Sequence, residues 1–154
     1  MSYSTIETLK NKIDVRLLIQ YVNDENDLEE DVDLEDLSDA RTARINQACE
    51  EVADEINNYL RGRYKLPVTS SNSTLQTISD DRTIYRLKMR RFRDNISESE
   101  QKIFDNTTRQ LQAIQRGEIV LDIEKVTSDQ NSQGQIFTNK KSKGRFATLL
   151  DDYE

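Results

Sequence analysis

Carboxylates are the side chains of this sequence best suited to chemistry, and most of them gather in one segment. Residues 24–39 hold ten acids and no base. Their oxygens could ligate calcium (Asp24, Asn26, Glu30, Asp31, Asp33 and Glu35), but a helix–loop–helix calcium site needs a glycine at its sharp turn. No glycine precedes Gly62. We therefore expect a solvated acidic loop, or one facing a basic neighbour, with no metal and no cofactor.

Catalysis by side chains has little support elsewhere in the chain. There is no histidine, so general base work would fall to carboxylates, lysine or tyrosine. The carboxylates show no acid/base spacing, and nothing indicates the metal site of a magnesium nuclease. The single cysteine, Cys49, lies among apolar helix positions and is expected to be a small buried side chain. We expect no catalytic residue and no enzyme activity.

Basic side chains are segregated from the acidic ones. Residues 82–93 hold six bases and no acid, and residues 140–145 hold four bases and no acid, within a chain of net charge −7. The first segment could neutralise phosphates while Tyr85 or Phe92 stacks on nucleic-acid bases. Alternatively, Tyr85, Met89 and Phe92 have core spacing, and the bases face the acidic run of the same or a neighbouring copy.

Segregated charge of this kind favours contacts between copies or docking on a charged partner. We expect two inter-subunit charge surfaces. The acidic one comprises Glu29, Glu30, Asp31 and Asp33, and the basic one comprises Arg86, Arg90, Arg91 and Arg93.

The elements that must position these groups read as helices, so the expected fold is an all-α small bundle. Ser4-x-x-Glu7 predicts a capping box that opens a short helix, and Asp14 can cap a second. A main helix is expected from about residue 38 to 61, with Ile45, Ala48, Cys49, Val52, Ile56, Tyr59 and Leu60 on one stripe. Gly62 is expected to close that helix with a positive φ.

Two further helices complete the expected bundle. One runs from about residue 75 to 93, with Leu75, Ile78, Tyr85, Met89 and Phe92 on one face and Arg82 interrupting it. The other opens at a Ser97-x-x-Glu100 capping box, carries Ile103, Phe104, Leu111 and Ile114, and closes at Gly117. An apolar run at residues 119–123 predicts an extended strap or a last strand.

Length and composition indicate one small domain. The chain has 154 residues, 34% of them apolar, and a mean hydropathy of −0.83, so the core must be small. No window approaches 18 apolar residues, and the N-terminus lacks the pattern of a secretory signal. We expect a helical domain at residues 1–123, followed at 124–154 by a flexible linker and a docking arm.

The C-terminal arm combines apolar anchors with basic spacing, which suits docking into a partner's groove. The expected docking residues are Phe137, Lys140, Lys141, Lys143, Arg145, Phe146, Leu149 and Leu150. The alternative is a frayed terminus.

One motif closes the main helix: Ile56-Asn57-Asn58-Tyr59-Leu60, followed by Arg63-Tyr64-Lys65-Leu66-Pro67. Its structural residues are expected to be Ile56, Tyr59, Leu60, Arg63, Tyr64, Leu66 and Pro67. The motif resembles the signature of the small Mu-like tailed-phage proteins of the head–tail junction. The resemblance extends over about residues 3–123. The sequence departs from the family pattern in three places: an acidic loop without glycine, a Ser/Asn-rich loop after Pro67 and an unmatched extension at 147–154.

The resemblance implies a structural virion protein, a head–tail connector also called an adaptor or head-completion protein. Such proteins form rings, usually of twelve copies, between the portal protein and other neck or tail-terminator proteins. DNA passes through the lumen without sequence readout. The expected location is the virion head–tail junction, and the host cytoplasm during assembly, with no membrane. The alternative is a small DNA-binding or regulatory protein that uses residues 82–93.

Overall fold

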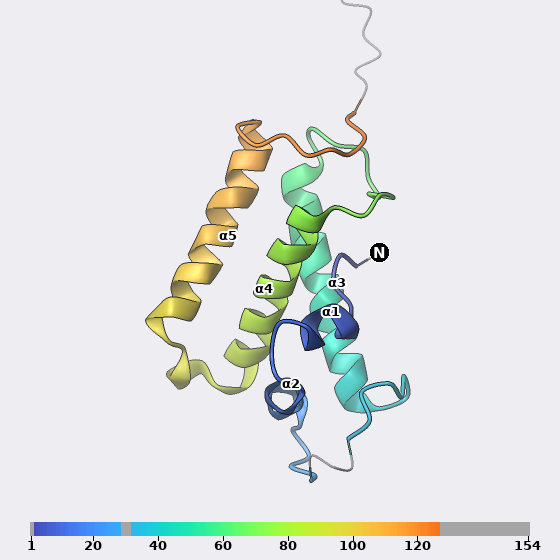
Figure 1. Cartoon of the computed structure of the whole chain (residues 1–154), viewed down its shortest axis with the longest axis vertical. Helices are drawn as coiled ribbons and strands as arrows, with labels where there is room; N and C mark the ends of the chain where they lie inside the picture. The colour runs from blue at the N-terminus through green and yellow to red at the C-terminus, as the bar shows by residue number, and fades with distance from the viewer. Residues whose placement is uncertain (1, 29–31, 127–154) are drawn as a thin grey trace, which may run out of the picture.

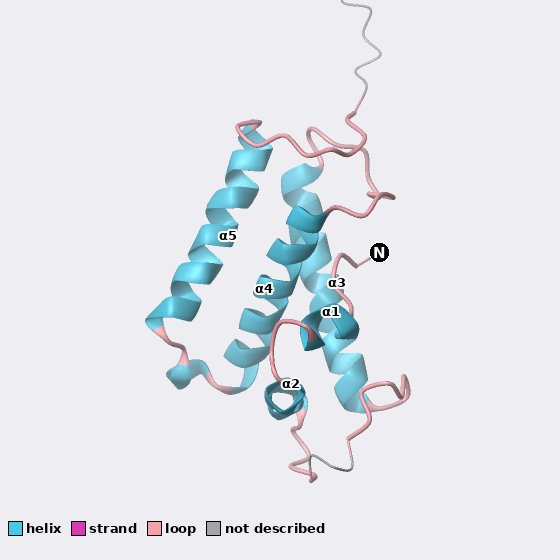
Figure 2. Ribbon diagram, in the orientation of Figure 1, coloured by secondary structure: helices cyan, strands magenta, loops and turns pink. Residues whose placement is uncertain are grey.

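The computed structural model describes residues 2–28 and 32–126, and within them the protein is a small helical bundle (Figures 1 and 2). The helices are α1 (Ile6–Lys10), α2 (Val15–Val22), α3 (Ala40–Leu60), α4 (Ser73–Arg91) and α5 (Glu98–Arg116), with a 3-10 turn, η2 (Arg93–Asn95), before α5. The described part has no strand and one isolated bridge, between Tyr64 and Lys125. The predicted all-α fold is confirmed.

Three long helices form the body, and the two short helices pack against it. In Figure 1, α3, α4 and α5 run side by side, α2 packs across the end where α3 begins and α4 finishes, and α1 lies against the middle of α4. None of the described helices is long and apolar enough to cross a membrane.

Side-chain caps explain where most helices begin and end. Asp14, Asp39 and Asn72 each accept a backbone N–H from the first turn of α2, α3 and α4. The predicted Ser97–Glu100 capping box is confirmed, and Gly117 ends α5 at a φ of +82°.

Two predicted boundaries are wrong. The first capping box is formed by Thr5 and Thr8, one residue after the Ser4–Glu7 pair that the sequence suggested. Ser4 is buried instead, and its hydroxyl donates to the Ser79 hydroxyl at 2.7 Å. Gly62 has no positive φ, because α3 ends on Arg61 in a right-handed conformation and passes into a turn.

The core consists of two apolar clusters that share α3. One cluster joins α1 and α2 to α3 and the end of α4, through residues such as Leu9, Leu18, Ile45 and Leu87. Cys49 belongs to it and is buried, as predicted. The other cluster joins α3, α4 and α5 beneath residues 118–126, and comprises Val52, Ile56, Leu60, Tyr64, Leu75, Ile78, Leu111, Ile114 and Leu121.

The predicted apolar face of α4 is only partly correct. Leu75 and Ile78 are buried, but Leu87 is the buried residue of the last turns, while Tyr85 and Met89 are half-buried. Arg82 does not interrupt the buried face; it belongs to it, with 2% of its surface exposed. On α5, Ile103 is 50% exposed rather than buried.

Residues 118–126, here called the strap, cross the end of the bundle where α3 stops and α4 begins (Figure 1). The backbone N–H of Lys65 donates to the Glu124 carbonyl, and that of Val126 donates to the Arg63 carbonyl. The paired segment includes residues 124–126, which were assigned to the linker from the sequence. It also supports the prediction of an extended strap rather than a strand.

Candidate functional site

The motif at residues 56–67 holds the strap against the bundle. Tyr64 is 1% exposed, and its hydroxyl accepts the backbone N–H of Leu121 at 2.9 Å. Ile56 and Leu60 are buried beneath it. A buried donor that found no partner would cost free energy, so this bond helps to set where the strap lies.

The other motif residues contribute less to that core. Tyr59 and Leu66 are half-buried against the same cluster, while Arg63 and Pro67 are exposed. The Arg63 guanidinium lies over Gly117 and donates to the Arg116 carbonyl at 3.4 Å. The motif is therefore a packing device that determines where the chain leaves the bundle toward its C-terminal arm.

Charged groups converge at the opposite end, around residues 23–27. The two terminal guanidinium nitrogens of Arg90 each donate a hydrogen bond to the Asp24 carboxylate, at 2.7 and 2.8 Å. Arg91 donates to the Gln20 and Asn23 carbonyls and to the Asn26 side chain. The hydrogen bond from Arg90 holds the pKa of Asp24 below its usual value.

Two arginines in the first turns of α3 form ion pairs with the same loop. Arg44 donates two hydrogen bonds to Glu25, at 2.9 and 2.5 Å, and one to the Val22 carbonyl. Arg41 pairs with Asp27 at 2.9 Å and with Asp39 at 2.8 Å. The Arg44 bonds lower the pKa of Glu25 to about 2. We call Arg41, Arg44, Arg90 and Arg91 the arginine clamp.

Part of the clamp was predicted and part was missed. Arg90 and Arg91 were expected on a charged surface, but Arg41 and Arg44 were not singled out. Their signal was present in the sequence, because they are the first bases after the acidic run and lie three residues apart on one helix. The clamp shows that Arg90 and Arg91 of the basic segment pair with Asp24 of the acidic run within one copy.

The remaining residues of the predicted charge surfaces are dispersed. Arg86 pairs with Glu51 at 2.7 Å and also with Glu55. Asp33 accepts the N–H of Glu35 within its own turn. Arg93 is exposed and has no ion pair among residues 2–28 and 32–126. Glu29, Glu30 and Asp31 lie outside the described residues, and the contact with a neighbouring copy stays a prediction.

A buried polar cluster between α3, α4 and α5 was not predicted. Arg82 pairs with Glu55, donates to the hydroxyls of Thr107 and Thr108, and places its guanidinium 4.3 Å from the centre of the Phe104 ring. The opposite charge and the aromatic face compensate for the burial of the guanidinium. The cluster joins the three long helices at mid-height.

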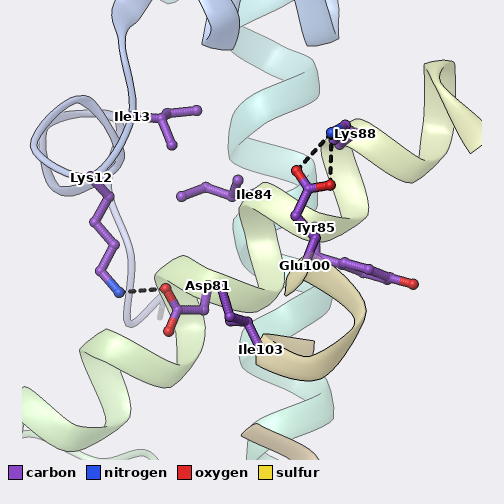
Figure 3. Close-up of a pocket in the computed structure, with 8 residues that line it drawn as sticks. All are labelled: Lys12, Ile13, Asp81, Ile84, Tyr85, Lys88, Glu100 and Ile103. Carbon is purple, nitrogen blue, oxygen red and sulfur yellow. Dashed lines mark hydrogen bonds and ion pairs between the residues drawn. The ribbon is translucent and has the colours of Figure 1, made fainter. Parts of the chain in front are cut away.

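A small hollow of about 230 Å³ lies between the α1–α2 turn, α4 and the first turns of α5 (Figure 3). Ile13, Ile84 and Ile103 form its apolar wall. Two ion pairs cross its rim: Lys12 with Asp81 at 2.5 Å, and Lys88 with Glu100 at 2.6 Å. Such a hollow has room for one apolar side chain.

The arm residues predicted to dock on a partner, Phe137 to Leu150, lie outside the described residues. Within the described part, no group of three or more histidine, cysteine or acidic side chains is arranged to hold a metal ion.

The fold and these surfaces define the class: a small all-α bundle with an arginine-clamped acidic loop and a strap leading toward a basic C-terminal segment. The chain belongs to the family described as Bacteriophage Mu, Gp36, whose model matches residues 3–139. No curated protein matches the chain. The predicted resemblance to Mu-like phage proteins is confirmed, while the head–tail junction role stays a prediction.

Proposed function

We propose that this protein is a structural, non-enzymatic virion component: the connector subunit that joins the portal protein to the neck or tail at the head–tail junction. Membership of the Mu phage family is the observation that carries the proposal, since it restricts the chain to phage biology. A small bundle with an all-α fold and a C-terminal arm suits an adaptor that fills a position between larger assemblies.

The proposed partners are the portal protein, other neck or tail-terminator proteins and further copies of this chain in a ring of about twelve, the number that the family resemblance implies. DNA would pass through the lumen without base-specific contacts. Assembly would take place in the host cytoplasm. The strap supports this arrangement, because it holds Val126, the last residue that the structure describes, beside Arg63 at the end of the bundle where α3 stops.

The DNA-binding alternative is less well supported by the geometry. Arg86, Arg90 and Arg91 are already bonded to carboxylates or carbonyls of their own chain. A phosphate would have to displace those acceptors. Binding to random duplex at low salt, falling steeply as salt rises, would restore this alternative.

The deciding experiment is co-sedimentation of the purified protein with portal rings from the same genome. We expect co-migration in a fixed ratio, near one copy per portal subunit. A variant lacking residues 136–154 should lose this co-migration while keeping the thermal transition of the bundle. A full-length chain that stays monomeric beside the portal would overturn the proposal. Retained binding by the truncated chain would overturn the role of the arm alone.

A further inference from the structure

A second, larger hollow lies on the face formed by α1, the loop before α3 and the first half of α3. Its volume is about 780 Å³. Ile6, Leu34, Leu37 and Cys49 supply apolar lining. Leu37 lies at its edge, 79% exposed, and extends the apolar lining to the surface.

The rim of this hollow is acidic. Glu7, Glu35 and Glu50 line it, and Lys10 is the one base among its lining residues. Lys10 reaches Glu35 at 3.7 Å. Glu7 and Glu50 are exposed and form no ion pair with any other residue that the structure describes. An apolar floor with an acidic rim fits a segment that carries apolar side chains and positive charge.

Residues 137–150 of this chain have that chemistry. They hold four bases and no acid, with Phe137, Phe146, Leu149 and Leu150 as apolar side chains. The acids of the 23–27 loop do not compete for this basic segment, because the arginine clamp already pairs with Asp24, Glu25 and Asp27. The negative charge of the rim is therefore complementary to the positive charge of residues 137–150.

The distance allows the contact within one molecule. The backbone pairs Val126 with Arg63, and Cys49 lies fourteen residues before Arg63, which corresponds to about 20 Å along a helix. The ten residues between Val126 and Phe137 can span up to about 35 Å when extended.

We propose that in the free protein residues 137–150 dock in this hollow of their own chain, with a phenylalanine on the apolar floor and the bases beside Glu7, Glu35 and Glu50. The contact occupies the arm until a partner displaces it. It concerns the isolated chain and stands whether or not the arm also binds a portal.

Tryptophan provides a clean reporter, because the natural chain has none. Phe137→Trp and Phe146→Trp are made separately in the full-length protein, and acrylamide quenching is measured. We expect at least one tryptophan to be shielded, with blue-shifted emission relative to the same protein in urea. Combining that variant with Glu7→Lys, Glu35→Lys and Glu50→Lys should remove the shielding.

A matched control reverses three exposed acids elsewhere: Asp94, Glu98 and Asp105 to lysine. This triple variant makes the same change in net charge and should leave the tryptophan shielded. Thermal melts of both triple variants verify that the bundle stays folded. Two fully quenched tryptophans, or equal loss of shielding in both triples, would overturn the proposal. Shielding that appears only at protein concentrations where dimers sediment would also overturn it, in favour of docking between copies.

Discussion

At the scale of the residue, Tyr64 shows how a family motif stabilises the fold through packing and one hydrogen bond. Its ring fills the space between the end of α3 and the strap, and its hydroxyl satisfies the Leu121 N–H. The sequence predicted a structural role for Tyr64 within the 56–67 motif but could not identify its partner, which lies 57 residues further along the chain.

Tyr64→Ala should lower the free energy of unfolding by about 2–4 kcal/mol, because a fully buried ring leaves a cavity. Tyr64→Phe should cost about 1–3 kcal/mol, since it leaves the buried Leu121 N–H unpaired. Urea unfolding followed by circular dichroism measures both changes. Tyr59→Phe is the control, because the half-buried Tyr59 hydroxyl bonds no other described residue. Unchanged stability in Tyr64→Ala would contradict the role of the motif.

Arg82 and Arg86 form a natural pair of tests, because both contact Glu55 but differ in exposure. Arg82→Ala should destabilise the protein by about 3 kcal/mol, since it removes the buried partner of Glu55, which keeps its pair with Arg86, and deprives the Thr107 and Thr108 hydroxyls of their donor. Arg86→Ala should cost less than about 1 kcal/mol, because its side chain is 42% exposed. Equal losses of stability in the two variants would refute a special role for the buried cluster.

At the scale of the element, the two glycines that follow helices behave differently. Gly117 needs its positive φ, and a Cβ there would meet the Arg63 guanidinium. Gly62 has no positive φ and open space around it.

Gly117→Ala should therefore destabilise the protein by about 1–2 kcal/mol. Gly62→Ala should be neutral or stabilising by about 0.4–1 kcal/mol, because alanine restricts the unfolded chain. Thermal melts of the two variants, measured side by side, decide the matter. A loss of stability in Gly62→Ala would show that the turn after α3 needs glycine after all.

The arginine clamp makes the anchoring of α2 dependent on pH. Glu25 has a folded pKa of about 2 against its usual 4.5, and the pKa of Asp24 is also lowered. A lowered folded pKa contributes stability above the unfolded value, and this contribution is lost as pH falls through the folded value. The loss from Glu25 should therefore occur between about pH 4.5 and pH 2.

Urea unfolding at pH 7 and at about pH 3 tests this dependence. The free energy of unfolding should fall less between the two values in Glu25→Gln than in the natural chain, because the variant no longer titrates there. Glu98→Gln, on an exposed carboxylate at the start of α5, is the control and should keep the natural slope. Identical slopes in all three proteins would show that the clamp does not couple to protonation.

At the scale of the whole molecule, the clamp changes how assembly should be tested. Reversing the charge of Arg90 would break its bonds to Asp24, so lost assembly could come from a loosened α2. Arg93 avoids this problem, because it is exposed and lacks a described ion pair.

Arg93→Glu should weaken association with the portal complex without changing the melting temperature, whereas Arg90→Glu should lower both. Sedimentation velocity of the mixture and thermal melts of the free proteins provide the two measurements. Normal assembly by Arg93→Glu would count against a neighbour-facing surface at the end of α4.

Local patterns in the sequence were sufficient to predict the helical fold, the caps at Ser97 and Gly117, the burial of Cys49 and the packing role of the 56–67 motif. These features depend on residues close together in the chain, where spacing and capping chemistry act directly. The family resemblance was also readable from that motif.

The tertiary structure decided the features that join distant segments. Arg82 looked like an interruption of an apolar face, but α3 and α5 supply Glu55 and Thr107, which make its burial favourable. The clamp likewise needed α2, α3 and α4 packed together before four arginines could meet one acidic loop. Charge segregation along the chain is compatible with contacts within one copy or between copies. Only the packing of the helices shows that much of the positive charge is paired within the chain, because ion pairs depend on distance in space rather than on separation in sequence.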